Sequence, residues 1–227
     1  MTGTFEGFLL VLGRTSGIFL SAPVFSARQL PVSVKVLMAV LLSLIISMVA
    51  PVESAKPLES PGIFTLAVAS EILVGYTLGF VVYLAFAAIQ LAGQLIDMQM
   101  GFGIVNVIDP QSGTQVPLVG NFQYLIALLV FLGIDGHHMI IRALYDSYRL
   151  IPVLGAQFDG QFVQFMVGLA GSMFVVAVKI AAPIVAAVFM ADIAMGFLAR
   201  TVPQMNVFIV GLPLKIFDAR DQAADGV

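Results

Sequence analysis

The sequence has no cysteine and no tryptophan, and charged side chains make up only 10% of its 227 residues. Without cysteine, the chain can form no disulfide, no cysteine-ligated zinc site and no thiol nucleophile. Without tryptophan, any aromatic belt at a membrane interface must come from the 5 tyrosines and 18 phenylalanines. A net charge of -3 offers phosphate no attraction, which argues against nucleic-acid binding.

Hydrophobic side chains are what the sequence has in excess. They make up 60% of the chain, and its mean hydropathy is +1.05. An ordinary soluble domain is about 45–50% apolar and about 25% charged, so the composition argues against a soluble enzyme or a disordered regulator. The 21 glycines suit closely packed membrane helices. We therefore expect an all-α membrane protein.

Long apolar runs predict where the helices lie. The runs are Phe5–Ala22, Val36–Ala50, Gly62–Ile96, Val116–Ile134 and Gly160–Ala199. As one helix, the third run would extend roughly 50 Å, more than the roughly 30 Å of a hydrocarbon core. It is therefore expected to bend, to project from the bilayer or to be something other than a simple span. The last run contains Pro183 and predicts either one long broken helix or a tight helical pair.

Two pairs of glycines have the spacing that brings membrane helices close together. Gly13 and Gly17 form one pair, and Gly75 and Gly79 form the other. Glycines four residues apart lie on one helix face and allow another backbone to approach. The pattern fits a contact between subunits and packing within the chain equally well.

Ionisable residues inside apolar runs are energetically expensive and hence candidates for function. They are Arg14, Glu71, Asp97, Lys179 and Asp192. One interpretation is a proton or ion relay, and the other is interhelical pairing or snorkelling at a helix end. Lys179 and Asp192 are expected on largely opposite faces of one straight helix, so they would meet only if Pro183 marked a turn.

Motifs for catalysis or cofactor binding are missing from the sequence. It contains no nucleophile elbow, no glycine-rich phosphate loop and no His-Glu-x-x-His zinc motif. His137 and His138 follow Asp135 and Gly136, but adjacent helical residues do not share a face, which favours a polar helix boundary over a metal site. We therefore expect no enzyme activity, no cofactor and no metal.

The segment from Gly101 to Pro117 combines turn residues with apolar residues between two strongly apolar runs. Its glycines and prolines disfavour a helix. In a bilayer, an apolar non-helical segment is tolerated only where protein buries it or where it lines a cavity. A pore-plugging loop and a surface loop packed on helix ends both fit. The plug residues would be Gly101, Phe102, Gly103, Ile104, Val105, Asn106, Val107, Ile108, Asp109 and Pro110.

Four blocks of the sequence, taken in order, resemble the FliR family. They are Gly93–Gly101, Asp109–Gly113, Gly133–His138 and Pro203–Lys215, and the resemblance runs from Phe5 to Phe217. FliR proteins are the flagellar subunits of the type III export gate and are related to a subunit of virulence type III secretion. The combination of blocks is much more specific than any block alone.

This resemblance implies a subunit of the protein export gate in the bacterial inner membrane, within the flagellar basal body. The implied fold is a bundle of long bent helical hairpins that projects beyond the usual bilayer plane. The implied partners are FliP-like, FliQ-like and FlhB-like subunits and unfolded export substrates, and the segment at Gly101–Pro117 would plug the closed channel. The alternatives are a virulence export apparatus and a secondary transporter whose relay would use Glu71, Asp97, Lys179 or Asp192.

The end of the sequence departs from the family pattern. Residues 1–217 are expected to form a single helical export-gate domain, and residues 218–227 a polar, exposed tail. Related proteins continue after the block at Pro203–Lys215 with a further apolar helix. The resemblance therefore predicts that the last helical hairpin lacks one arm.

Overall fold

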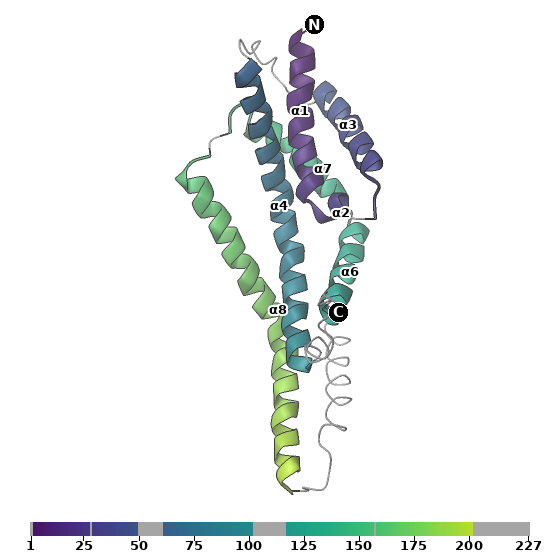
Figure 1. Cartoon of the computed structure of the whole chain (residues 1–227), viewed down its shortest axis with the longest axis vertical. Helices are drawn as coiled ribbons and strands as arrows, with labels where there is room; N and C mark the ends of the chain where they lie inside the picture. The colour runs from purple at the N-terminus through teal and green to yellow at the C-terminus, as the bar shows by residue number, and fades with distance from the viewer. Residues whose placement is uncertain (1, 28, 50–60, 102–116, 157, 202–227) are drawn as a thin grey trace. The chain divides into compact units, whose positions relative to one another are not determined.

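The computed structural model describes residues 2–27, 29–49, 61–101, 117–156 and 158–201, and these residues are helical with no strand (Figure 1). The all-α prediction is confirmed. The helices are α1 (Thr2–Ser21), α2 (Pro23–Ser26), α3 (Val32–Val49), α4 (Pro61–Met100), α6 (Leu118–Gly133), α7 (Gly136–Leu150) and α8 (Gly160–Thr201).

Prolines lie at the start of four of the seven described helices and follow the end of one. Pro23 and Pro61 are the first residues of α2 and α4, where the missing N–H is no loss. Pro31 and Pro117 directly precede α3 and α6, and Pro152 follows the end of α7. The polar and proline-containing stretches of the sequence therefore separate the helices, as their composition predicts.

Two helices are much longer than a bilayer span requires. Helix α4 has 40 residues and α8 has 42, which corresponds to about 60 Å each. Helix α8 continues through Pro183 as one element, so of the two arrangements that the sequence allowed, the tight pair is wrong. Helix α4 is longer than the hydrocarbon core is thick, so its departure from a simple span stays a prediction.

Residues with positive φ terminate two of the helices. Gly101, at φ 83°, follows α4, and its N–H bonds the carbonyl oxygen of Met98 at 3.2 Å. Asp135, at φ 59°, lies between α6 and α7, whose axes bend by 67°. This turn makes α6 and α7 a bent helical pair.

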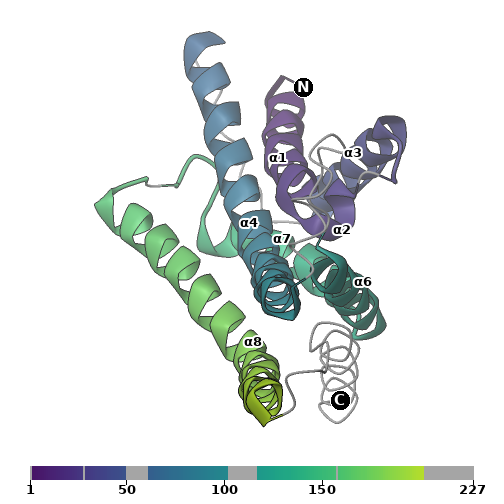
Figure 2. The same ribbon diagram turned by 60° about the horizontal axis from the view of Figure 1, so that its bottom comes forward.

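The chain divides into two compact units, of which unit 1 comprises Met1–Phe86 and Leu128–Ala170. Its core joins α1, α2, α3 and α7, and α1 lies beside α3 and α4 in both views (Figures 1 and 2). The core side chains are those of Val11, Ile18, Phe19, Ala22, Phe25, Ala39, Ile46, Ile140, Leu144 and Tyr148.

Unit 2 comprises Ala87–Ala127 and Gly171–Val227. Its core lies between the C-terminal part of α4 and the middle of α8, and its side chains are smaller on average. They are Ala88, Ala92, Ile96, Met100, Ala177, Ala181 and Val188. Small residues let these two helices approach closely.

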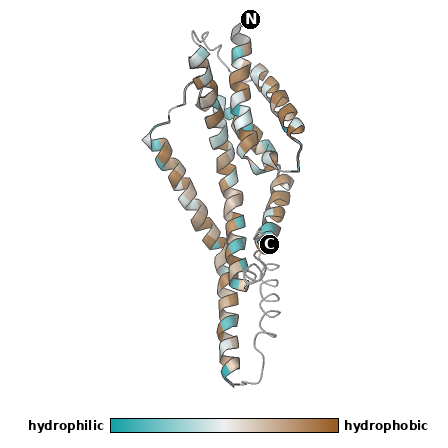
Figure 3. Cartoon of the chain, in the orientation of Figure 1, coloured by the Kyte–Doolittle hydropathy of each residue, from teal (hydrophilic) through white to brown (hydrophobic). Residues whose placement is uncertain are grey.

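Large apolar side chains stay exposed along α3 and α8, and Figure 3 shows both helices as mainly hydrophobic. In the most apolar window of each helix, only 17% of the residues are buried inside the chain. Three described helices, α3, α4 and α8, are long and apolar enough to cross a membrane, and the bent pair α6 and α7 could form a fourth span. The chain is therefore a membrane-embedded helical bundle, since water would not tolerate these faces.

Candidate functional site

The four glycines of the Gly-x-x-x-Gly pairs lie where α1 crosses α4. A Cβ on Gly75 would collide with the backbone of Arg14, and one on Gly17 would collide with Ile72, Gly75 and Tyr76. A Cβ on Gly13 would lie 3.3 Å from the carbonyl oxygen of Val68. In unit 1, these glycine faces therefore serve packing within the chain, because only glycine allows the two backbones to come this close.

The crossing of α1 and α4 buries an ion pair. Arg14 Nε donates to Glu71 Oε2 at 2.6 Å, and both side chains are 0% exposed. Removing two charges from water is very unfavourable unless they are paired and the remaining donors and acceptors are bonded. The surroundings of Arg14 and Glu71 therefore decide whether the pair is tolerated.

Further partners come from α7 and from the connection that follows it. Arg14 Nη1 donates to Ser147 Oγ at 3.1 Å and to the carbonyl oxygen of Ile151 at 3.0 Å. The second oxygen of Glu71, Oε1, accepts the N–H of Leu154 at 3.1 Å. The guanidinium carbon of Arg14 also lies 4.2 Å from the ring centroid of Tyr148. The pair thus fastens α1, α4, α7 and the start of the α7–α8 connection together.

Both oxygens of Glu71 are engaged by partners in the same unit. One donor nitrogen of the cluster, Arg14 Nη2, is buried and has no hydrogen-bond partner among the described residues. Interhelical pairing therefore explains why both charges are buried. This is the alternative to the relay hypothesis. It needs no proton-carrying role for Glu71.

Asp97 is a buried carboxylate of unit 2 and lies near the end of α4. It is 6% exposed, and its two oxygens accept the N–H groups of Val119 at 3.1 Å and Gly120 at 3.2 Å. These N–H groups belong to the first turn of α6, where a helix has unpaired donors and a partial positive charge. Asp97 therefore caps a neighbouring helix and has no cationic partner in this contact.

A second close approach in unit 2 supports the cap. A Cβ on Gly93 would collide with the backbone of Gly120, one turn of α4 before Asp97. Gly93 thus lets α6 come near enough for the carboxylate of Asp97 to reach its N–H groups. The end of α4 and the start of α6 are held together on both sides of the segment at 102–116.

The two remaining charges of the predicted set lie on α8. Lys179 is exposed and Asp192 is half-buried, and α8 is continuous between them. The turn at Pro183 that would have let them meet is not formed. Within unit 1 the structure brings Arg14 to Glu71, and within unit 2 it gives Asp97 the N–H group of Val119 as a partner.

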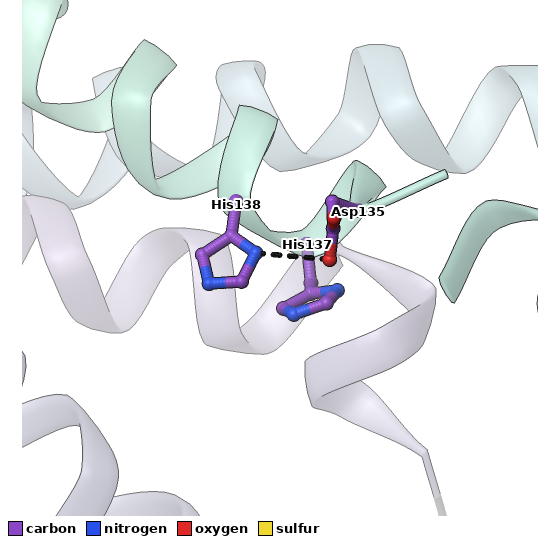
Figure 4. A group of neighbouring side chains, drawn as sticks. All are labelled: Asp135, His137 and His138. Carbon is purple, nitrogen blue, oxygen red and sulfur yellow. Dashed lines mark hydrogen bonds and ion pairs between the residues drawn. The ribbon is translucent and has the colours of Figure 1, made fainter. Parts of the chain in front are cut away.

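The turn between α6 and α7 brings together Asp135, His137 and His138, whose potential ligand atoms all lie within 4.8 Å (Figure 4). His138 Nδ1 lies 3.3 Å from Asp135 Oδ1, and both side chains are mostly exposed. The sequence did not indicate that Asp135 would lie beside the two histidines. Its backbone is left-handed, at φ 59°, and it directly precedes α7. The hydrogen bond between Asp135 and His138 explains why these side chains lie together, and it favours a polar helix boundary over a metal site.

Most of the predicted plug lies outside the described residues. Of the ten residues from Gly101 to Pro110, only Gly101 is described, at the end of α4. The polar tail at 218–227 and the block at Pro203–Lys215 also lie outside them.

Comparisons with known proteins agree with this helical membrane chain. The sequence profile of the family described as "Bacterial export proteins, family 1" matches residues 5–219. The chain is 43% identical to the flagellar biosynthetic protein FliR of Bacillus subtilis over 215 residues, which cover 93% of the chain and 82% of that protein.

Two further relatives extend the range of similarity. The chain is 30% identical to the flagellar biosynthetic protein FliR of Escherichia coli, over 89% of the chain and 77% of that protein. It is 27% identical to the Yop proteins translocation protein T of Yersinia pestis, over 92% of the chain and 80% of that protein.

Proposed function

The chain belongs to family 1 of the bacterial export proteins, and on that premise we propose that it is a subunit of the flagellar type III protein export gate. It would sit in the inner membrane within the flagellar basal body and help to form the channel for unfolded flagellar substrates. The observation that carries this proposal is the 43% identity to a FliR protein over 93% of the chain. The weaker similarity to a Yop translocation protein, at 27%, makes a virulence apparatus the second candidate.

The test is complementation of a Bacillus subtilis strain that lacks its own FliR. We expect the chain to restore swimming and the appearance of flagellar filament protein outside the cell. Gly75→Leu, which drives a large side chain into the backbone of Arg14, is the inactive control. A well-expressed chain that restores neither swimming nor export, but does restore secretion in a strain lacking the virulence homologue, would favour the second candidate.

The proposed partners are FliP-like and FliQ-like subunits, with an FlhB-like subunit associated. Support comes from α8, where Phe165, Phe174 and Phe197 are 58%, 57% and 67% exposed. Large contiguous apolar surfaces mark membrane contact or protein interfaces. Lipid and neighbouring subunits would cover these faces together.

Expression of the chain alone and with a FliP-like subunit, followed by gel filtration in detergent, tests this part. We expect aggregation of the chain alone and one defined complex with the partner. A stable monodisperse monomer without any partner would contradict the assembly.

We also propose that residues 101–110 plug the closed channel. Support comes from their mixture of apolar and turn residues and from Asp97 and Gly93, which hold the end of α4 beside the start of α6. Ile104, Val107 and Ile108 would supply the apolar surface that excludes water and ions.

Deletion of residues 104–108 tests the plug in cells that carry the partner subunits. We expect the assembly to form and the membrane to leak small ions, read as conductance or as growth under ionic stress. An intact complex in a tight membrane would support the surface-loop alternative.

A further inference from the structure

An open groove of about 340 Å³ lies in unit 1, between α3 and α7. Its α3 wall is entirely apolar and consists of Ile45, Ile46 and Val49. Ile46 is 4% exposed and forms the floor, whereas Ile45 and Val49 are 59% and 64% exposed. Helix α3 is one of the described helices that are long and apolar enough to cross a membrane, so an acyl chain is a suitable neighbour for this wall.

The α7 wall differs from the α3 wall because it carries polar groups. It consists of His138, Ile141, Arg142 and Tyr145, which recur at a spacing of three and four residues and therefore share one helix face. Another face of α7 packs into the core through Ile140, Leu144 and Tyr148. Because this core packing holds α7 in place, the other face of α7 holds the polar side chains along the groove.

Arg142 is the exposed cation of this groove. Within the described part of the chain, no ion pair or hydrogen bond engages its guanidinium. Asp135 Oδ1 lies 3.3 Å from His138 Nδ1, so this carboxylate is directed at the imidazole. Asp146, one turn after Arg142, does not line the groove. The groove thus joins an apolar wall to a cation, an imidazole and a phenol.

We propose that this groove binds the headgroup and upper acyl chain of an anionic phospholipid. The Arg142 guanidinium would pair with the phosphate, since a planar guanidinium matches phosphate oxygens with two parallel hydrogen bonds. The Tyr145 hydroxyl would donate a further bond, and the acyl chain would lie along Ile45 and Val49. A free phosphate ion would leave this apolar wall uncovered, so the lipid fits the groove better.

The test is lipid binding by the full-length protein, co-purified in mild detergent with the subunits that hold it. Native mass spectrometry with phosphatidylglycerol and phosphatidylcholine measures how many lipids of each kind are retained. We expect phosphatidylglycerol to be preferred, and Arg142→Gln to reduce its binding about tenfold, since a hydrogen bond to a charged group is worth at least that factor. Arg142→Lys should restore part of the preference because it keeps the charge.

Arg149→Gln is the matched control, since Arg149 is an exposed cation of the same helix that does not line the groove. It should leave lipid binding unchanged. Val49→Trp, which fills the apolar end, should weaken binding of the phospholipid while leaving Arg142 in place. Circular dichroism and gel filtration check that each variant folds and assembles.

Four results would overturn the proposal. The first is equal retention of both lipids, and the second is equal loss of phosphatidylglycerol in the Arg142 and Arg149 variants. The third is displacement of the lipid by millimolar inorganic phosphate, which would identify a site for the ion alone. If residues 50–60 of the chain filled the groove instead, Arg142→Gln would alter stability without altering lipid binding, which also contradicts the proposal.

Discussion

The two units of the chain bury a carboxylate in apolar helices in two different ways. In unit 1, Glu71 meets the guanidinium of Arg14 at 2.6 Å, and neither side chain is exposed. In unit 2, Asp97 accepts two backbone N–H groups from the first turn of α6. One arrangement contains two opposite charges, and the other contains one charge that faces a helix dipole.

This difference decides what a mutation leaves behind. If Arg14 is removed, Glu71 loses its cationic partner in an apolar site and has only the N–H of Leu154 as a partner. If Asp97 is removed, the charge itself disappears, and only two N–H groups lose their acceptor. The first defect should be more severe because a buried unpaired charge is far less favourable than an unpaired amide.

The largest expected effect is that of Arg14→Met. We expect the free energy of unfolding to fall by about 3–5 kcal/mol, the range for breaking one side of a buried pair. Denaturant titration of the purified complex, followed by far-UV circular dichroism, measures it.

The double variant Arg14→Met with Glu71→Leu is the control for that loss. It should recover most of the stability, since apolar replacement of a whole buried pair is often neutral. A double variant as unstable as the single one would show that the pair stabilises the fold beyond neutralising its own charges.

Asp97→Ala should be less severe than Arg14→Met. Loss of the acidic cap at the N-terminus of α6 predicts a destabilisation of about 0.5–2 kcal/mol. Asp97→Asn keeps one acceptor oxygen and should fall between alanine and the wild type. Hydrogen exchange at the N–H groups of Val119 and Gly120 should accelerate in both variants, and unchanged protection there would contradict the cap.

The glycine contacts extend the comparison to the backbone. Gly75→Ala in unit 1 and Gly93→Ala in unit 2 each place a methyl group against a facing backbone, with an expected destabilisation of about 1–3 kcal/mol. Gly171→Ala is the control, since a Cβ there has nothing within 4 Å. Only Gly75→Ala should depend on the ion pair, so its effect should change in the double Arg14 and Glu71 background.

The smallest expected effect is that of Lys179→Met. Lys179 is exposed on α8, so its replacement should change the free energy of unfolding by less than about 0.5 kcal/mol. Swimming of the complemented strain should also be unaffected. Loss of export in a folded Lys179→Met protein would revive the relay hypothesis for α8.

The sequence predicted the helices far better than it predicted their partners. Apolar runs and prolines are local signals, and they located α1, α3, α4, α6 and α8 to within a few residues. The glycine spacing marked the correct faces of α1 and α4, but spacing cannot say whether the other backbone belongs to the same chain. That answer depends on how the helices cross.

The charged residues show why the sequence could not predict which side chains pair. Arg14 and Glu71 are 57 residues apart in the sequence, and Arg14 and Ser147 are 133 apart. Helix α7 could have been found, since Ile140, Leu144 and Tyr148 recur at helical spacing within a polar stretch. Its groove with α3 could not, because a groove requires two helices to be placed side by side.

We infer that the buried carboxylates Glu71 and Asp97 stabilise the packing of the helices and take no part in proton transfer. The most direct test is export of flagellar filament protein by Bacillus subtilis lacking its own FliR and carrying the Arg14→Met, Glu71→Leu double variant. We expect export and swimming at near wild-type level when the double variant is as abundant as the wild-type chain. An abundant, assembled double variant that exports nothing would contradict it and assign Glu71 a role in the transport step.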